Sequence, residues 1–242
     1  LGMGEPLSNL LITAGVGRKP GETRLDLAAK NVAIARDVTK NLMKYYNGGA
    51  VMVISNPVDV ITYLIQKESG LPAGRVFGTG TVLDSARFRY FLSTRLDADI
   101  RNIHGFTAGE HGESQFAVWS SVHVSGMRLD SFCAKRGIAL DKDEVMKDTV
   151  SSGAQVIKRK GVTNYAIAAI AAELASTVVK NKHSIFSVSS VLHDYYGIND
   201  VAISVPSFVG DEGVVGNLVY DFTAEETEKL RNSAKQLRAF LD

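Results

Sequence analysis

The stretch from Val51 to Gly80, VMVISNPVDVITYLIQKESGLPAGRVFGTG, contains a complete strand–helix–strand unit. Residues 51–54, VMVI, form an apolar run typical of a strand buried on both faces. Asn56 and Pro57 indicate a helix start, with asparagine as the cap and proline at the first helical position. Residues 70–72, GLP, indicate its end, and residues 75–77, RVF, predict the next strand. This order and spacing predict a parallel sheet with crossover helices.

The same alternation extends to both sides of this unit. Upstream, residues 10–13, LLIT, predict a strand that stops at Ala14 and Gly15. Apolar residues then recur at steps of three and four from Arg24 to Tyr46, which predicts an amphipathic helix. Downstream, a helix is expected from about Leu83 to Arg95. We therefore expect an α/β fold whose first part is a Rossmann-like parallel sheet.

The pattern changes after about residue 100. Short β-prone segments at 100–104, 116–119 and 122–124 precede two long predicted helices at 141–159 and 164–180. Residues 184–192 and 201–205 predict strands of a hairpin or meander. The last helix begins with a capping box, in which Thr223 is the cap and Glu226 reaches back to it. We expect residues 1–80 to belong to a nucleotide-binding domain and residues 81–242 to form an α+β substrate or catalytic domain.

Composition excludes several classes of protein. The 242 residues are 45% hydrophobic and 22% charged, with a formal net charge of +1, which gives no reason to expect nucleic acid or an anionic membrane as a partner. Cys133 is the only cysteine, so no internal disulfide can form. No apolar run reaches the roughly 20 residues that a membrane span needs, and no secretory signal is visible. The expected location is cytoplasmic.

Three loops at the predicted carboxyl ends of strands are unusually tight or polar: residues 13–15 (TAG), 55–57 (SNP) and 78–80 (GTG). Ligands of doubly wound sheets bind at this edge. Glycine there lets the backbone approach a flat ring or a phosphate closely. Each loop taken alone is equally compatible with an ordinary strand-to-helix turn.

His111 is the strongest candidate for proton transfer. It lies in residues 109–113, GEHGE, where two glycines allow a tight bend, and its pKa is expected near neutrality. Asp84 stands at a helix start, and Arg87, three residues further on, shares its face. A histidine held by a carboxylate beside an arginine is a workable site for reducing a 2-keto acid. The alternatives are an exposed loop histidine and an aspartate that only stabilises the helix dipole.

Two other features of the sequence are the basic segment at residues 18–24, which has two interpretations, and the spacing of the histidines, which argues against a metal site. Residues 18–24, RKPGETR, read by default as a solvated basic loop, but they also suit a mobile flap that brings positive charge onto an anionic substrate. A zinc hydrolase is disfavoured and no metal is expected, because the histidines show no H-x-x-x-H pair and no cysteine partner at ligand spacing. The histidines are His104, His111, His123, His183 and His193.

Taken together, these segments resemble the lactate/malate dehydrogenase family. The matching blocks are ITAG (12–15), RKPGETR (18–24), NPVD (56–59), GTGTVLDSAR (78–87), GEHGES (109–114) and KGVT (160–163). They follow the family's order and spacing from about Leu10 to Asp242. The resemblance implies NAD as cofactor, a small 2-keto or 2-hydroxy acid as substrate, and a homodimer or homotetramer.

The resemblance also implies roles for individual residues. His111 would be the proton donor and acceptor, oriented by Asp84, and Arg87 would bind the substrate carboxylate with two parallel hydrogen bonds. Arg24, on the flap, would polarise the carbonyl group, and Asn56 would hydrogen-bond the same oxygen. Thr163 would edge the substrate pocket. The residues expected to line the cofactor are Thr13, Ala14, Gly15, Ser55 and Asn56.

The sequence departs from the family at its start. The phosphate-binding glycine-rich turn should precede Leu10, yet residues 1–9, LGMGEPLSN, lack both its spacing and the acidic residue that follows it. We therefore expect the N-terminal part of the Rossmann-like sheet to be missing from this chain. If Leu1 were the true start, NAD binding would be weak or absent. An inactive, truncated family member that acts as a binding or scaffold protein is the corresponding alternative.

Arg18 is the second departure. This position commonly carries glutamine in the family's lactate dehydrogenases and arginine in its malate dehydrogenases, whereas Glu22 and Thr163 are lactate-type. An arginine closed over the methyl group of pyruvate would be desolvated and unpaired, while over oxaloacetate it would meet a second carboxylate. Alternatively, Arg18 points to solvent or pairs with Glu22. The charge argument slightly favours oxaloacetate and malate and leaves pyruvate and lactate open.

Overall fold

The computed structural model describes residues 9–17 and 24–241, with backbone only for residues 24–26. The first half of the chain contains β1 (Leu10–Ile12), α1 (Arg24–Leu42), β2 (Val51–Val53), α2 (Val58–Ser69), β3 (Val76–Gly78) and α3 (Val82–Leu96). Next come η1 (Ile100–Asn102), β4 (Ile103–His104), β5 (Thr107–Ala108), β6 (Phe116–Ala117), η2 (Trp119–Ser121), β7 (His123–Val124) and β8 (Met127–Arg128). The rest comprises α4 (Leu129–Arg136), α5 (Lys142–Lys160), α6 (Tyr165–Val179), β9 (Ser184–Val191), β10 (Ala202–Gly210), β11 (Gly213–Asn217) and α7 (Ala224–Leu241).

One mixed sheet of six strands, in the order β1-β2-β3-β9-β10-β11, organises the molecule. The pairs β1–β2 and β2–β3 are parallel, as predicted from the strand–helix–strand unit. β9 joins β3 in antiparallel fashion through Gly78 and Ser189, and it forms the predicted antiparallel pair with β10. The sheet therefore contains strands from both sides of residue 80, and the division into two domains at that residue stays a prediction.

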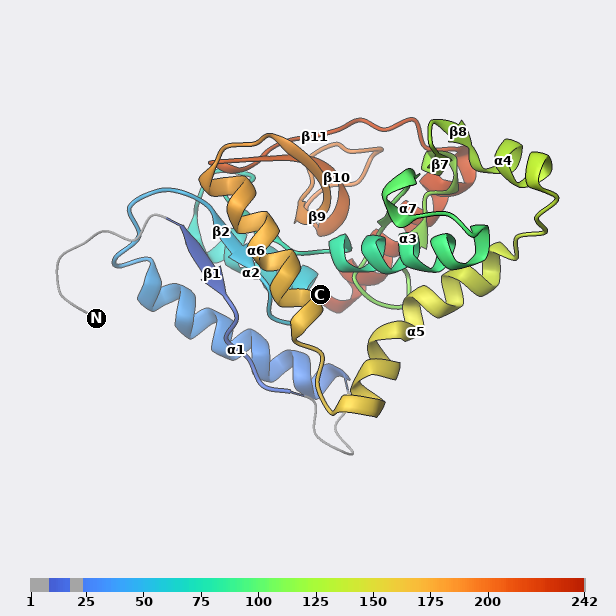
Figure 1. Ribbon diagram of the computed structural model, residues 1–242. Helices are drawn as coiled ribbons and strands as arrows, with labels where there is room; N and C mark the ends of the chain where they lie inside the picture. Colours follow the sequence, from blue (N-terminus) through green and yellow to red (C-terminus); the bar gives the residue numbers. More distant parts are fainter. Residues whose placement is uncertain (1–8, 18–23, 242) are drawn as a thin grey trace.

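Alternate residues of the central strands pack against different helices. Val51 and Val53 face a core that includes Ile61 and Ile65 of α2. Met52 faces the opposite core, which includes Leu174 of α6. Figure 1 shows α6 crossing the sheet on one side. This period of two on a doubly covered sheet explains why residues 51–54 are all apolar.

A separate core lies beside the sheet. Phe88 and Leu92 of α3 pack there with Leu129 of α4 and Val145 of α5. The small antiparallel sheet β4-β7-β8 contributes Ile103 and belongs to the same cluster. The helix α3 thus connects the main sheet, at its N-terminus, with this second core.

Three local predictions were wrong. Asn56 does not cap α2: Pro57 is the cap residue, in extended conformation after a cis peptide bond, and no side chain caps the helix. Residues 100–102 form the short 3₁₀ helix η1 rather than a strand, and its cap residue Asp99 accepts a hydrogen bond from the Arg101 backbone N–H through Oδ1 at 2.8 Å. Trp119 likewise lies in the turn η2 and not in a strand. The short strand β11 was not predicted.

The capping box of α7 is confirmed. The Thr223 backbone N–H donates to Glu226 Oε2 at 2.9 Å, and the Glu226 backbone N–H donates to Thr223 Oγ1 at 3.2 Å. Glu226 also accepts hydrogen bonds from the backbone and hydroxyl of Ser120. No helix within residues 9–17 and 24–241 has the length and apolar character needed to cross a bilayer.

We predict that Thr223→Ala lowers the free energy of unfolding by about 1 kcal/mol, because the N–H of Glu226 loses its acceptor. Urea unfolding followed by circular dichroism measures this change. Thr223→Ser keeps the hydroxyl and serves as the control, with a much smaller expected loss. Equal stability of the alanine variant and the original protein would contradict the assignment.

Candidate active site

The loop that carries His111 turns sharply after β5. Gly109 has a φ of 97°, in the left-handed region that favours glycine, and a Cβ there would lie 2.9 Å from Ser233 Oγ. Its backbone N–H donates to the Ser204 carbonyl at 2.9 Å, and the Ser204 N–H donates back at 3.1 Å. This bridge to β10 fixes where the loop leaves the sheet.

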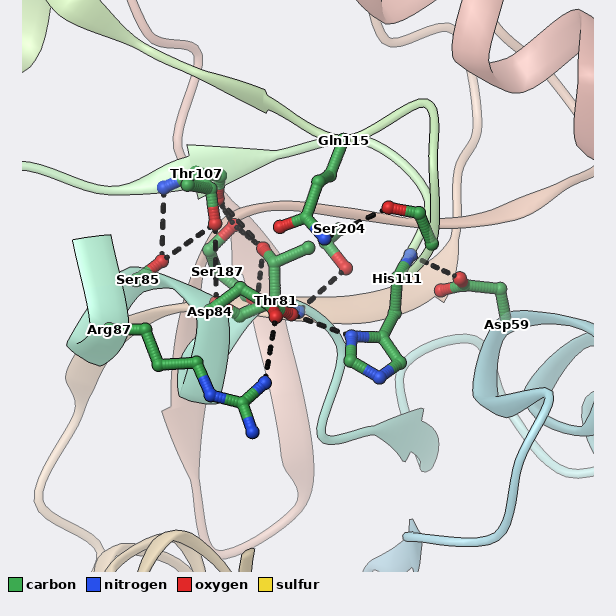
Figure 2. Close-up of polar contacts among 11 residues, drawn as sticks. Asp59, Thr81, Asp84, Ser85, Arg87, Thr107, His111, Gln115, Ser187 and Ser204 are labelled. Carbon is green, nitrogen blue, oxygen red and sulfur yellow. Dashed lines mark hydrogen bonds and ion pairs between the residues drawn. The ribbon is translucent and has the colours of Figure 1, made fainter. Parts of the chain in front are cut away.

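The next two backbone amides of this loop are bound by other elements. The Glu110 N–H donates to Ser233 Oγ of α7 at 2.8 Å. The His111 N–H donates to Asp59 Oδ2 of α2 at 2.7 Å, as drawn in Figure 2. Three consecutive amides are thus held by β10, α7 and α2, so the loop is fixed although it has no regular structure of its own.

Buried hydroxyl groups fix the N-terminus of α3, where Asp84 lies. Thr81 Oγ1 donates to the Thr107 carbonyl at 2.7 Å and lies 2.9 Å from Ser187 Oγ. Ser85 Oγ accepts the Thr107 backbone N–H at 3.0 Å. The Thr81 backbone N–H donates to Ser204 Oγ at 3.1 Å. These contacts tie α3 to β5, β9 and β10, and they set the position of the Asp84 side chain (Figure 2).

Asp84 contacts both of the other candidate side chains. His111 Nδ1 lies 2.6 Å from Asp84 Oδ2, and Arg87 Nη1 lies 3.4 Å from Asp84 Oδ1. Figure 2 shows the second ring nitrogen of His111 directed away from Asp84. A carboxylate on Nδ1 places the transferable proton on Nε2, so the imidazole is oriented for proton exchange with a group on its open side.

Burial and charge set the pKa values of this pair. Burial disfavours the charged imidazole, but the contact with Asp84 outweighs it and raises the pKa of His111 to about 9. Burial likewise works to raise the pKa of Asp84, yet His111 and Arg87 hold it below its ordinary value. The expectation of a pKa near neutrality for His111 was therefore wrong, because a sequence does not show a buried carboxylate on the ring.

A cavity of about 620 Å³ adjoins these residues. Five of the residues predicted for the site line it: Asn56, Asp84, Arg87, His111 and Thr163. Apolar side chains complete much of the wall, among them Ile54, Leu83, Val150, Ile157 and Ile167. The structure thus brings together groups that are up to 107 residues apart in sequence, counted from Asn56 to Thr163.

The other predicted residues are placed differently. Ser55 Oγ donates to the Ala14 carbonyl at 2.6 Å, so the loops after β1 and β2 adjoin, but residues 13–15 and Ser55 do not line the cavity. Arg18 lies outside the described residues. Arg24 begins α1, and its side chain is also outside the described part of the chain.

Sequence reasoning missed three residues that organise the site. Asn31 Nδ2 donates to the Asn56 carbonyl at 2.7 Å, and Asn31 Oδ1 accepts the Val16 N–H at 2.8 Å. Its position on the apolar face of α1, three residues after Ala28, was an available signal. Asp59 and Ser233 hold backbone amides, and such contacts leave no sequence pattern.

Two family models match the chain in succession. Residues 6–78 match the lactate/malate dehydrogenase NAD-binding domain, and residues 81–242 match the lactate/malate dehydrogenase α/β C-terminal domain. An L-lactate dehydrogenase of Thermoanaerobacter sp. is 42% identical over 235 residues, which cover 96% of this chain and 76% of the relative. L-lactate dehydrogenase 1 of Clostridium acetobutylicum is 41% identical and covers 96% and 75%.

Solved structures of L-lactate dehydrogenases are also similar to this chain. An L-lactate dehydrogenase from Clostridium thermocellum superposes with a TM-score of 0.87 at 48% identity, over 96% of this chain and 76% of that one. The minor L-lactate dehydrogenase of Enterococcus mundtii, in a ligand-bound form, gives 0.92 at 36% identity over 97% and 76%. The chain therefore belongs to the lactate/malate dehydrogenase family of NAD-dependent oxidoreductases.

Proposed function

We propose that the chain catalyses reversible hydride transfer between NADH and a small 2-keto acid, with pyruvate and L-lactate as the substrate pair. One observation carries the proposal: an imidazole, its carboxylate partner and a guanidinium adjoin a single cavity whose walls are partly apolar. The relatives named above are all L-lactate dehydrogenases, which supports the choice of substrate.

His111 is the proposed acid and base. With a pKa of about 9, its ring is protonated at neutral pH and can donate a proton to the substrate oxygen as the carbonyl is reduced. In the reverse direction the neutral ring accepts that proton. Asp84 stays ionised throughout, because its pKa is lowered, and it balances the charge that forms on the ring.

Arg87 is the proposed anchor for the substrate carboxylate. Its side chain is mostly buried at the cavity wall, where a charge-assisted hydrogen bond is stronger than in water. Asn56 and Thr163 line the same cavity and are proposed to bind the substrate, with Asn56 donating to its oxygen. Arg24, the first residue of α1, is proposed to polarise the carbonyl group. A homodimer or homotetramer belongs to the same proposal.

The residues present fit the nicotinamide end of the cofactor. Ile54 and Ile167 offer apolar wall for a flat ring, and Thr79 and Gly80 follow β3 at the edge where the loops after β1 and β2 also emerge. When bound, NAD supplies or accepts the hydride. The chain's own residues orient the substrate, exchange the proton and exclude water from the cavity.

Arg18 is the one observation in favour of oxaloacetate and malate. Among the described residues that line the cavity, the side chains able to carry positive charge are Arg87 and His111. A second substrate carboxylate would therefore need a further cation, and Arg18 is the candidate from the sequence. The apolar walls favour the methyl group of pyruvate instead.

We predict that kcat/KM for pyruvate exceeds that for oxaloacetate by at least about tenfold. Burying the second carboxylate of oxaloacetate without a partner is unfavourable, and the free-energy cost corresponds to more than a tenfold loss of kcat/KM. Steady-state rates of NADH oxidation measure both values. Arg18→Gln should leave the ratio nearly unchanged, because we expect that Arg18 does not pair with a second substrate carboxylate. A preference for oxaloacetate that Arg18→Gln abolishes would establish malate chemistry, and no turnover of either acid would favour the inactive alternative.

His111→Gln should lower kcat by roughly 100- to 10,000-fold, since glutamine cannot exchange a proton. NADH binding, followed by protein fluorescence, should change little. His104→Gln, an equal substitution at an exposed position of β4, serves as the control and should keep full activity. Substantial turnover by His111→Gln would remove the proposed acid–base role.

We predict that Asp84→Asn lowers the pKa of His111 by about one unit or more, because the imidazolium loses its nearest negative charge. Titration of the His111 Cε1–H resonance by NMR measures this pKa, and the spectrum of His111→Gln assigns the peak. Asp99→Asn removes a carboxylate of an exposed ion pair and should leave the titration unchanged. An unchanged pKa in Asp84→Asn would contradict the electrostatic account.

A further inference from the structure

Asp59 differs in charge from the other groups that hold the His111 loop. Ser204 accepts from Gly109 with a carbonyl, and Ser233 accepts from Glu110 with a hydroxyl, so both of these acceptors are neutral. Asp59 accepts from the His111 N–H with a carboxylate at 2.7 Å. A neutral asparagine or serine would supply the same kind of acceptor. The charge at this position therefore needs a separate explanation.

Burial makes the negative charge of Asp59 energetically unfavourable. Asp59 is 3% exposed. Burial raises its pKa to about 6, although the hydrogen bond from the His111 N–H works to lower it, so the ionised form predominates at neutral pH. Within the described residues, its other oxygen, Oδ1, lacks a partner in hydrogen-bond geometry. The position of Asp59 in the first turn of α2 stabilises the ionised carboxylate, because the helix dipole favours an anion there.

The protonated ring of His111 offsets the unfavourable burial of the Asp59 charge. The charged groups that act on the His111 ring are Asp84 and Arg87 from α3 and Asp59 from α2. Asp84 and Asp59 favour the protonated ring, and Arg87 opposes it. Glu110, in the same loop as His111, acts on Asp59 and raises its pKa. Two carboxylates from different helices thus contact His111: Asp84 at a ring nitrogen and Asp59 at the backbone N–H.

We propose that Asp59 is a positioning residue for the proposed reaction. Asp59 holds the His111 backbone, and its negative charge favours the protonated imidazole. The inference rests on the proposed function of His111 as acid and base. It assigns to Asp59 two separable effects, a geometric one through the backbone N–H and an electrostatic one on the ring. Variants at Asp59 and Ser233 separate these effects.

Asp59→Asn keeps an acceptor for the His111 N–H but removes the charge. The pH at which kcat/KM for 2-keto acid reduction falls should move down by roughly 0.5 to 1 unit, because the ring then loses its proton more readily. At pH values below that fall, kcat should stay within about threefold. Ser233→Ala is the matched control, because it removes a neutral hydrogen-bond acceptor that holds the same loop. It should lower kcat at every pH without shifting the pH at which kcat/KM falls.

NMR titration of His111 gives a readout that needs no turnover. Asp59→Asn should lower the titration midpoint of its Cε1–H resonance, and Ser233→Ala should leave that midpoint in place. In the unmodified protein, the same resonance should show a second, smaller inflection near pH 6 as Asp59 ionises. This last measurement stands even if Asp59→Asn does not fold.

The outcomes separate the two proposals. If the protein is active but Asp59→Asn leaves both profile and titration unchanged, or the unmodified protein shows no inflection near pH 6, the role of Asp59 is overturned while the proposed function stands. If Asp59→Asn and Ser233→Ala change the kinetics alike, Asp59 is only an anchor. If no 2-keto acid is turned over although the NMR shifts are observed, the proposed function fails and the electrostatic link remains.

Discussion

The contact between the partly exposed His111 ring and the buried carboxylate of Asp84 is the interaction on which the site depends. Burial alone would keep the imidazole neutral and would raise the pKa of the carboxyl group, so each charge is unfavourable without the other. At 2.6 Å the two charges stabilise each other. Such a pair is stable only if neither partner can move away, because a small separation leaves the buried charge of Asp84 without its nearest compensating charge. The surrounding structure has to fix both partners independently.

The fold achieves this by joining distant strands in one sheet. β9 and β10 come from late in the chain, yet β9 pairs with β3 and β10 pairs with β9. β9 carries Ser187 and β10 carries Ser204. Ser187 contacts Thr81 at the start of α3, and Ser204 pairs with Gly109 at the start of the His111 loop. The same two neighbouring strands therefore position both the carboxylate and the imidazole. An error in their register would disturb both partners together.

The regular part of the fold could be predicted because its signals are local. The apolar run at 51–54 and the steps of three and four in α1 follow from how each segment is buried, and the glycine at position 70 ends α2 in the left-handed conformation. β11 was missed because only two of its five residues are apolar, Val214 and Val215, and its pairing with β10 is not visible in the segment itself. The cap of α2 was predicted wrongly, since Pro57 has the extended conformation of a cap residue and the helix begins one residue later, at Val58.

The site could be predicted as far as its side chains carry recognisable chemistry. Asp84 and Arg87 follow from helical spacing, and His111 from its glycine-flanked loop; the structure places the three in contact. Asp59 was missed because its partner is a backbone N–H, which every non-proline residue has. The pKa of His111 was missed for a related reason: it depends on burial and on two carboxylates that are 27 and 52 residues away in sequence.

Charge balance links these contacts to the direction of the proposed reaction. Asp59, Asp84, Arg87 and His111 are joined by hydrogen bonds or ion pairs, and their charges cancel only when the imidazole is protonated. The protonated form is the one that reduction of a keto group requires, and at neutral pH it predominates because the pKa of His111 is about 9. Oxidation of the hydroxy acid requires the neutral ring, which leaves the two carboxylates in excess over the one remaining cation. In the proposed reaction, the electrostatics that stabilise the His111–Asp84 pair would therefore favour reduction of the keto acid at neutral pH and oxidation of the hydroxy acid only at higher pH.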